Sequence, residues 1–198
     1  MVPNATGVYL LWIPLGAGGS GVVRASGRLY ERLMAWRHRR PTLDLYHTAL
    51  ILRIDDAEHV VETMWPSPAG DPATRGVVVS APVFADPLGR VRLFRYEVRS
   101  WRNGVVPDAA AAVGGPRLVE SDPQAIRRLL DLVPSVPALV WGRDQRATGD
   151  MWNSNSVISW LLTRIGVGME SITPPASGRA PGWEAGIAVA LAQPAPAG

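Results

Sequence analysis

Runs of apolar and β-branched residues predict most of the regular structure of this chain. The first strand is expected over 7–13, where an apolar run is ended by Pro14 and a glycine-rich segment. Similar runs predict further strands over 45–54, 59–65, 77–84, 91–101, 137–142 and 185–192. The connections between neighbouring runs are rich in Asp, Gly and Pro, so the pattern indicates an antiparallel sheet.

Apolar residues at helical spacing predict three helices. The first covers 26–40, with Ser26 as its N-cap and basic residues in its last turn. The second covers 121–133 with Ser121 or Asp122 as its cap, and the third covers 154–166. We therefore expect an α+β fold in which an antiparallel sheet packs against a few helices. The predicted organisation is a single domain, 1–192, and a disordered tail, 193–198.

The glycine-rich segment GAGGSG at 16–21 is predicted to be a loop. It lacks the G-x-x-x-x-G-K-[ST] pattern of a phosphate-binding loop. The residues that follow are not expected to open directly into a helix, which a nucleotide site of this kind requires. We predict no nucleotide cofactor.

Composition excludes several kinds of chemistry. The 198 residues include no cysteine, which excludes disulfides, thiol catalysis and thiolate-bound metals. The three histidines, His38, His47 and His59, show no metal-ligand spacing, so no metal centre is expected. An apolar segment at 7–23 is too short and too interrupted by Gly and Pro to span a membrane. It also lacks the basic start of a signal peptide, so we expect a soluble, cytoplasmic protein.

The net charge of +3 and the isoelectric point of about 9.9 reflect scattered arginines and a basic cluster at 36–40. Such a cluster attracts phosphates or an anionic membrane surface, but a solvated helix end is the simpler interpretation. No nucleic-acid motif is present, so no nucleic-acid partner is predicted. The oligomeric state is left open.

The segment GDMWNSNSVISWLL at 149–162 has the pattern of a catalytic helix start. Unpaired backbone N–H groups at a helix N-terminus stabilise an oxyanion beside a nucleophile. Ser154 and Ser156 are the candidate nucleophiles, and either needs a base because a free hydroxyl attacks poorly at neutral pH. His47, at the start of a predicted strand, is the best-placed base. The alternative for Ser154 is an ordinary N-cap.

Two stretches resemble the circularly permuted branch of the papain-like superfamily, which includes NlpC-type peptidases and lecithin retinol acyltransferase-like enzymes. YHTALILRIDDAEHVVE, at 46–62, resembles the histidine-bearing hairpin of these proteins. NSNSVI, at 153–158, is similar to their N-C-x-x-F-V helix start, with Ser154 at the position of the cysteine. The segments LFRYEVRSW, WGRD and GRAPGW resemble, as a set, actinobacterial proteins of similar length whose function is not known.

The resemblance implies a permuted papain-like fold with Ser154 as nucleophile, His47 as general base and Glu62 as the residue that orients the imidazole. If Asp55 pairs with Glu58, Glu62 lies opposite Ile51, about 13 Å along the strand from His47. Glu97 and Asp44 are therefore kept as alternative orienting residues. The residues proposed for substrate binding are Trp65, Trp152, Asn153, Asn155 and Arg179.

These features lead to three hypotheses. The first is a serine-dependent hydrolase or acyltransferase that acts on an amide, ester or thioester carbonyl of a small-molecule, peptidyl or acyl substrate. The second is a catalytically silent module that binds a small molecule or a protein. The third is a basic surface protein that docks on anionic partners through Arg37, Arg39 and Arg40.

Overall fold

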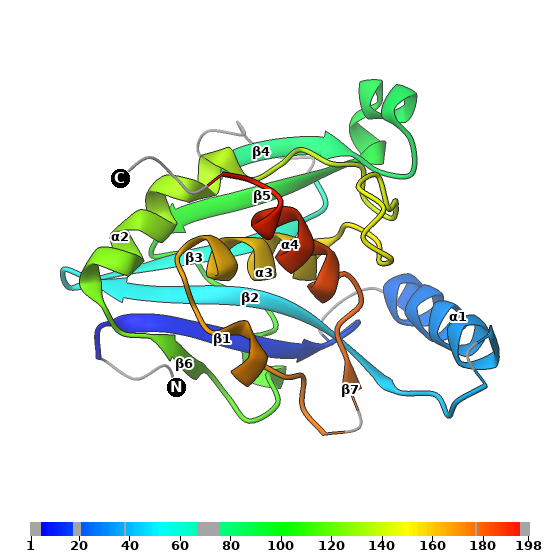
Figure 1. Cartoon of the computed structure of the whole chain (residues 1–198), viewed down its shortest axis with the longest axis horizontal. Coiled ribbons are helices and arrows are strands. Elements are labelled where there is room, and N and C mark those ends of the chain that lie inside the picture. The colour runs from blue at the N-terminus through cyan, green and yellow to red at the C-terminus, as the bar shows by residue number, and fades with distance from the viewer. Residues whose placement is uncertain (1–4, 18–20, 38, 67–75, 177, 195–198) are drawn as a thin grey trace.

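A computed structural model describes residues 5–17, 21–37, 39–66, 76–176 and 178–194, without the side chains of 21–27. Within these ranges, seven strands form a sheet in the order β4-β5-β3-β2-β1-β6, with β7 paired to β2 off this path (Figure 1). The strands are β1 (Gly7–Pro14), β2 (Asp44–Ile54), β3 (Ala57–Met64), β4 (Val77–Pro82), β5 (Arg95–Arg102), β6 (Arg117–Glu120) and β7 (Gly178–Arg179). The described helices are α1 (Gly21–Arg37), α2 (Pro123–Leu132), α3 (Ser154–Arg164) and α4 (Trp183–Leu191), besides short 3₁₀ turns.

The predicted α+β class with an antiparallel sheet is confirmed. Each strand from β1 to β6 pairs antiparallel with its neighbours, and the short β7 runs parallel to β2. None of the helices in the described ranges combines the length and the apolar character needed to cross a bilayer.

The sheet has two covered faces, because successive side chains of a strand point to opposite sides. We call the side that carries Leu50 and Leu52 of β2 the helix face; it packs against α2, α3 and α4 in one large apolar core (Figure 1). The other side carries Ala49 and Ile51 and packs against Val106 and the alanines that follow it. We call it the loop face. This division decides which side chains of β2 meet which partners.

The β2–β3 hairpin closes through a two-residue turn, Asp55 and Asp56, both at positive φ (50° and 57°). Ile54 pairs with Ala57, and Arg53 pairs with Glu58. The expected pairing of Asp55 with Glu58 is therefore wrong. Aspartate tolerates the left-handed region, which makes the tight turn accessible. Continued along the strands, the observed register places Glu62 opposite Ala49 rather than Ile51.

Several predicted boundaries are also corrected. Helix α1 begins at Gly21, the last residue of the glycine-rich segment, so Ser26 is not its N-cap. The expectation that this segment does not open directly into a helix is therefore wrong. Residues 18–20 of the segment lie outside the described ranges. Residues 92–94 form a 3₁₀ turn before β5 begins. The strand expected over 137–142 is reduced to one bridge between Trp141 and Val83.

The last predicted strand, 185–192, is the helix α4. Its run AGIAVALA is apolar throughout and has no strand or helix period, and four of its residues are alanine, the strongest helix former. Residues 195–198 of the predicted disordered tail lie outside the described part of the chain.

The close crossing of α3 and α4 yields a first prediction. A Cβ added at Gly186 of α4 would overlap the Ser159 hydroxyl and the Ser156 carbonyl of α3. We expect Gly186→Ala to lower the free energy of unfolding by about 2 kcal/mol or more, because two backbones must separate. Chemical denaturation measures this. Gly168→Ala is the control, since its Cβ would meet only the mobile end of Glu170. Equal effects of both substitutions would contradict the packing described.

Candidate functional site

The N-terminus of α3 is capped by Asn153, not by Ser154. The Asn153 Oδ1 atom accepts hydrogen bonds from the backbone N–H groups of Asn155 (2.9 Å) and Ser156 (3.4 Å). In return, the Ser156 hydroxyl accepts a hydrogen bond from the Asn153 N–H at 3.0 Å. This reciprocal arrangement is a capping box. Asn153 and Ser156 therefore have structural roles at the helix N-terminus. Ser154 takes no part in this capping box.

Asn155 joins α3 to the sheet. Its side chain is buried, with 2% of the residue exposed. Its Nδ2 atom donates to the carbonyls of Tyr46 (3.0 Å) and Pro181 (2.9 Å), and its Oδ1 accepts from the Thr48 hydroxyl (3.0 Å). One amide thereby holds the helix start, the middle strand and the segment before α4 together.

Ser154 differs from the other polar residues at the start of α3, because its hydroxyl and its backbone N–H make no described hydrogen bond. It is buried, with 7% of the residue exposed. Within the described ranges, neither its hydroxyl nor its backbone N–H has a hydrogen-bond partner. The arrangement leaves a hydroxyl beside the positive end of a helix dipole, where a developing negative charge is stabilised.

His47 engages a different residue. Its Nε2 atom lies 3.2 Å from Oδ2 of Asp108, in the segment that covers the loop face. Thr48, the next residue of β2, reaches Asn155 on the helix face, so strand alternation directs His47 to the opposite side. Among the hydrogen bonds of the described residues, none joins His47 to Ser154. The structure does not bring the expected base and nucleophile together.

Glu62 lies near the His47–Asp108 pair on the loop face. Burial raises the pKa of Glu62 to about 7; the negative charge of Asp108 adds to the increase and Arg99 opposes it. Its Oε1 atom is buried without a hydrogen-bond partner. The hydrogen bond from His47 lowers the pKa of Asp108 below its usual value, against the effect of burial.

Asp108, not Glu62, is thus the carboxylate in contact with the imidazole. It lies 61 residues from His47 in the chain. No spacing or motif in the sequence signals this pair, because it arises only when the loop after β5 folds back over the sheet. Of the two alternatives considered, Glu97 forms an ion pair with Arg99 at 2.6 Å, and Asp44 is exposed at the start of β2.

The other predicted binding residues are scattered. Trp152 belongs to the large core, and its indole N–H donates to the Tyr96 hydroxyl at 3.1 Å. Trp65 is half exposed, and its ring centroid lies 6.2 Å from that of Trp141. Arg179 is on β7, beside the first residues of β2.

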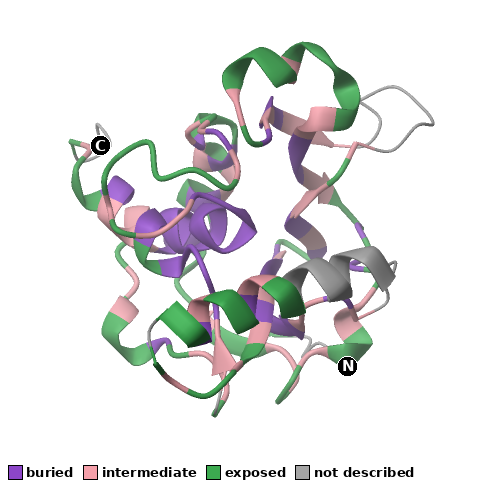
Figure 2. Cartoon of the chain, turned by 90° about the vertical axis from the view of Figure 1, so that its right-hand side faces the viewer, coloured by how far each residue is buried: buried purple, intermediate pink, exposed green. Residues whose placement is uncertain are grey.

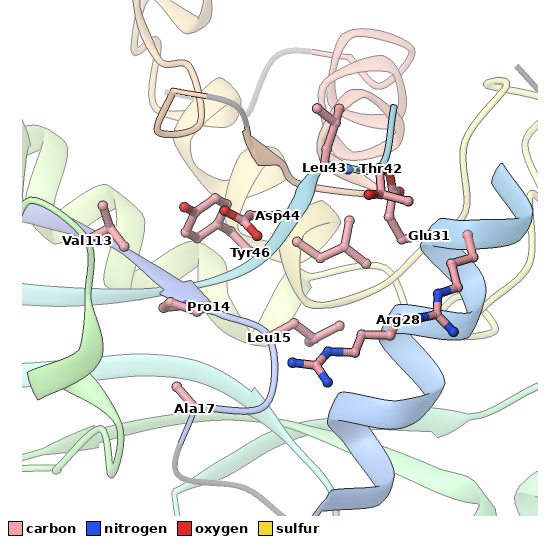
Figure 3. Close-up of a pocket in the computed structure, with 12 residues that line it drawn as sticks. Pro14, Leu15, Ala17, Arg28, Glu31, Thr42, Leu43, Asp44, Tyr46 and Val113 are labelled. Carbon is pink, nitrogen blue, oxygen red and sulfur yellow. Dashed lines mark hydrogen bonds between the residues drawn. The ribbon is translucent and has the colours of Figure 1, made fainter. Parts of the chain in front are cut away.

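A pocket of about 610 Å³ lies between α1 and the ends of β1 and β2 (Figure 3). Its apolar lining comes mainly from Pro14, Leu15, Ala17, Leu43, Leu45, Tyr46 and Val113. Its polar lining comes from Arg28, Glu31, Arg32, Thr42 and Asp44. Neither Ser154 nor His47 lines it, and sequence reasoning did not identify it.

The acidic and basic residues of α1 that line this pocket differ in their pairing: Glu31 is paired with Arg40, whereas Arg28 and Arg32 form no ion pair with another described residue. Glu31 is buried, and its carboxylate binds the Arg40 guanidinium and accepts from the Leu43 N–H at 2.8 Å. These contacts lower the pKa of Glu31, with the hydrogen bond from Arg40 as the largest cause. Arg28 and Arg32 are exposed, and neither forms an ion pair with another described residue. Positive charge therefore remains available at the wall formed by α1.

Comparisons with family models, curated proteins and solved structures find no match to this chain. Among the described residues, no three His, Asp or Glu side chains lie close enough to hold a metal ion.

The raised pKa of Glu62 predicts a pH-dependent stability. A carboxyl that is harder to ionise in the folded state binds its proton more tightly there, so stability is fully present below about pH 4.5 and is lost as the pH rises to about 7. Above that range we expect Glu62→Gln to exceed the native chain in unfolding free energy by up to about 3 kcal/mol. Denaturation between pH 4 and pH 8 measures it. The exposed Glu184→Gln is the control, and parallel pH profiles for the native chain and Glu62→Gln would refute the prediction.

The helix start yields a second prediction for this site. Asn155→Ala removes three buried hydrogen bonds, and we expect a loss of about 2–4 kcal/mol in unfolding free energy. Ser154→Ala removes no described hydrogen bond, so its effect is expected to stay within about 0.5 kcal/mol. Thermal and chemical denaturation of the two variants provide the measurement. A loss at Ser154 of the size typical for an N-cap would show that the capping assignment is wrong.

Proposed function

We propose that this protein is a binding module for a small organic anion, a carboxylate or a phosphate ester with an apolar part, held in the pocket beside α1. The observation that carries the proposal is the pair Arg28 and Arg32. They lie one helical turn apart on one wall of the pocket, and neither is neutralised by another described residue. Two guanidinium groups so placed suit an anionic group, which they bind with charge-assisted hydrogen bonds.

The rest of the lining is consistent with such a ligand. The apolar side chains contributed by β1, β2 and the segment around Val113 offer a surface for a hydrocarbon part. Thr42 and Asp44 add a hydroxyl and a carboxylate to the lining, and these groups suit a hydroxyl or amine of the ligand (Figure 3). A cytoplasmic location stays a prediction.

A second function is favoured by one observation, the unused hydroxyl and N–H of buried Ser154 at the start of α3. In this alternative, the protein is the serine-dependent hydrolase or acyltransferase of a permuted papain-like type that the sequence resemblance implies. It needs a base near Ser154, and His47 is bonded instead to Asp108 on the other face. For this reason we rank it below the binding module.

One experiment separates the two functions. The native chain is treated with a fluorophosphonate probe and, separately, screened by thermal shift against a panel of small carboxylates and phosphate esters. The binding module predicts no covalent adduct, and a rise in melting temperature with at least one anion. A Ser154-dependent adduct that is absent in Ser154→Ala would overturn this ranking in favour of the hydrolase.

The pocket is tested with matched arginine variants. We expect Arg28→Gln combined with Arg32→Gln to weaken the affinity for the anion by about tenfold or more, because charge-assisted hydrogen bonds are lost. Arg37→Gln, on the same helix but outside the pocket lining, should leave the affinity unchanged. Isothermal titration calorimetry measures both. Equal affinities for the native chain and the double variant would place the ligand elsewhere.

A further inference from the structure

Helix α1 presents an apolar stripe to solvent. Trp36 is 79% exposed, Leu29 is 70% exposed and Leu33 is 59% exposed. At roughly 100° per residue these three side chains fall within a narrow sector of one helix face. Single exposed apolar residues are ordinary on a protein surface, but three aligned on one helix indicate a surface that contacts something.

The inward side of α1 is already occupied. Ala35 is buried, and buried Glu31 is held by Arg40 and by the Leu43 N–H. The helix lies at one end of the molecule, beyond the strand ends, and most of its described outer residues are exposed (Figures 1 and 2). The stripe is therefore the free outer face of a helix that is fixed from within.

Arginines flank the stripe on both sides. Arg28 and Arg32 follow one edge and Arg37 follows the other, while Arg39 lies in the turn after the helix. Positions 21–40 contain six arginines and one glutamate, and that glutamate is paired with Arg40. An apolar stripe of Leu and Trp between arginines is the pattern of a helix that lies in a membrane interface.

We propose that α1 binds the surface of an anionic lipid membrane, with Leu29, Leu33 and Trp36 inserted among the lipids and the flanking arginines at the headgroups. Charge complementarity between the arginines of α1 and anionic lipid headgroups favours a membrane as the partner of this surface. A second copy of the chain would bring the same arginines face to face, and like charges oppose such a contact. An anionic bilayer supplies both an apolar layer and negative charge. The membrane surface shares Arg28 and Arg32 with the pocket, but Leu29, Leu33, Trp36, Arg37 and Arg39 do not line the pocket, so the two proposals can fail separately.

Vesicle co-sedimentation of the full chain tests the proposal. We expect binding to phosphatidylcholine vesicles that contain roughly one-third phosphatidylglycerol, and at least tenfold weaker partitioning onto pure phosphatidylcholine. Binding should also fall as salt is raised, because the charge attraction is screened. Equal binding to the two vesicle types, or none to either, would overturn the proposal.

Variants locate the contact. Leu33→Ser combined with Trp36→Ser should reduce partitioning at least tenfold, and Arg37→Gln combined with Arg39→Gln should weaken it and flatten its salt dependence. Leu118→Ser, an exposed apolar residue of β6, is the matched control and should bind as the native chain does. These positions do not line the pocket, so anion binding there should persist. If the variant with Leu33→Ser and Trp36→Ser binds anionic vesicles as strongly as the native chain does, the proposal is overturned.

A fluorescence measurement separates insertion from simple attraction. Lipids brominated along their acyl chains quench a tryptophan that enters the bilayer. The native chain should lose emission with such vesicles, and Trp36→Phe, which keeps the other seven tryptophans, should lose far less. Light scattering gives the oligomeric state. A dimer that Leu33→Ser with Trp36→Ser disrupts would assign the stripe to a second copy and overturn the membrane proposal.

Discussion

The buried amide of Asn155 is the interaction on which the arrangement of the site depends. It bonds to the strand β2 at Tyr46 and Thr48, and to Pro181 just before α4. A buried polar group is costly when unpaired, so these bonds fix the start of α3 against one strand register. Once Thr48 faces α3, strand alternation directs His47 to the other side of the sheet. The position of one amide thus separates the two residues that a hydrolase would need to combine.

The polar groups of the loop face form a separate system. His47 bonds to Asp108, and the buried Glu62 nearby has its pKa raised to about 7, first by burial and then by the charge of Asp108. The hydrogen bond from His47 lowers the pKa of Asp108, so the carboxylate that holds the imidazole ionises more readily than Glu62. Perturbed groups of this kind accompany function in many proteins, but they also arise where a loop buries charges for structural reasons. None of these three residues lines the pocket beside α1, and the His47–Asp108 contact joins the segment after β5 to the sheet.

How far the sequence predicts this structure depends on the range of the interactions involved. The strand β1 and the β2–β3 hairpin were predicted, since their β-branched runs end at local turn residues. The expected register was wrong because the two-residue turn is formed by Asp55 and Asp56 rather than by Asp56 and Ala57, and the turn composition alone did not show which pair of residues forms it. The helix α4 was predicted as a strand, because an apolar run without periodicity fits either. Asp108 and the pocket beside α1 depend on contacts between distant segments, which no local pattern reports.

The helix α1 contributes residues both to the wall of the pocket and to the exposed apolar stripe. Its inner side needs the carboxylate of Glu31 to hold the chain at Arg40 and Leu43, and that pairing removes the only acidic charge of the helix. Among the described side chains, Arg28 and Arg32 at the pocket wall and Arg37 beside the exposed stripe form no ion pair. Loss of the Glu31 carboxylate would therefore affect more than the anchoring of α1. It would release Arg40 and add positive charge to a surface whose proposed affinity for anions already rests on arginine.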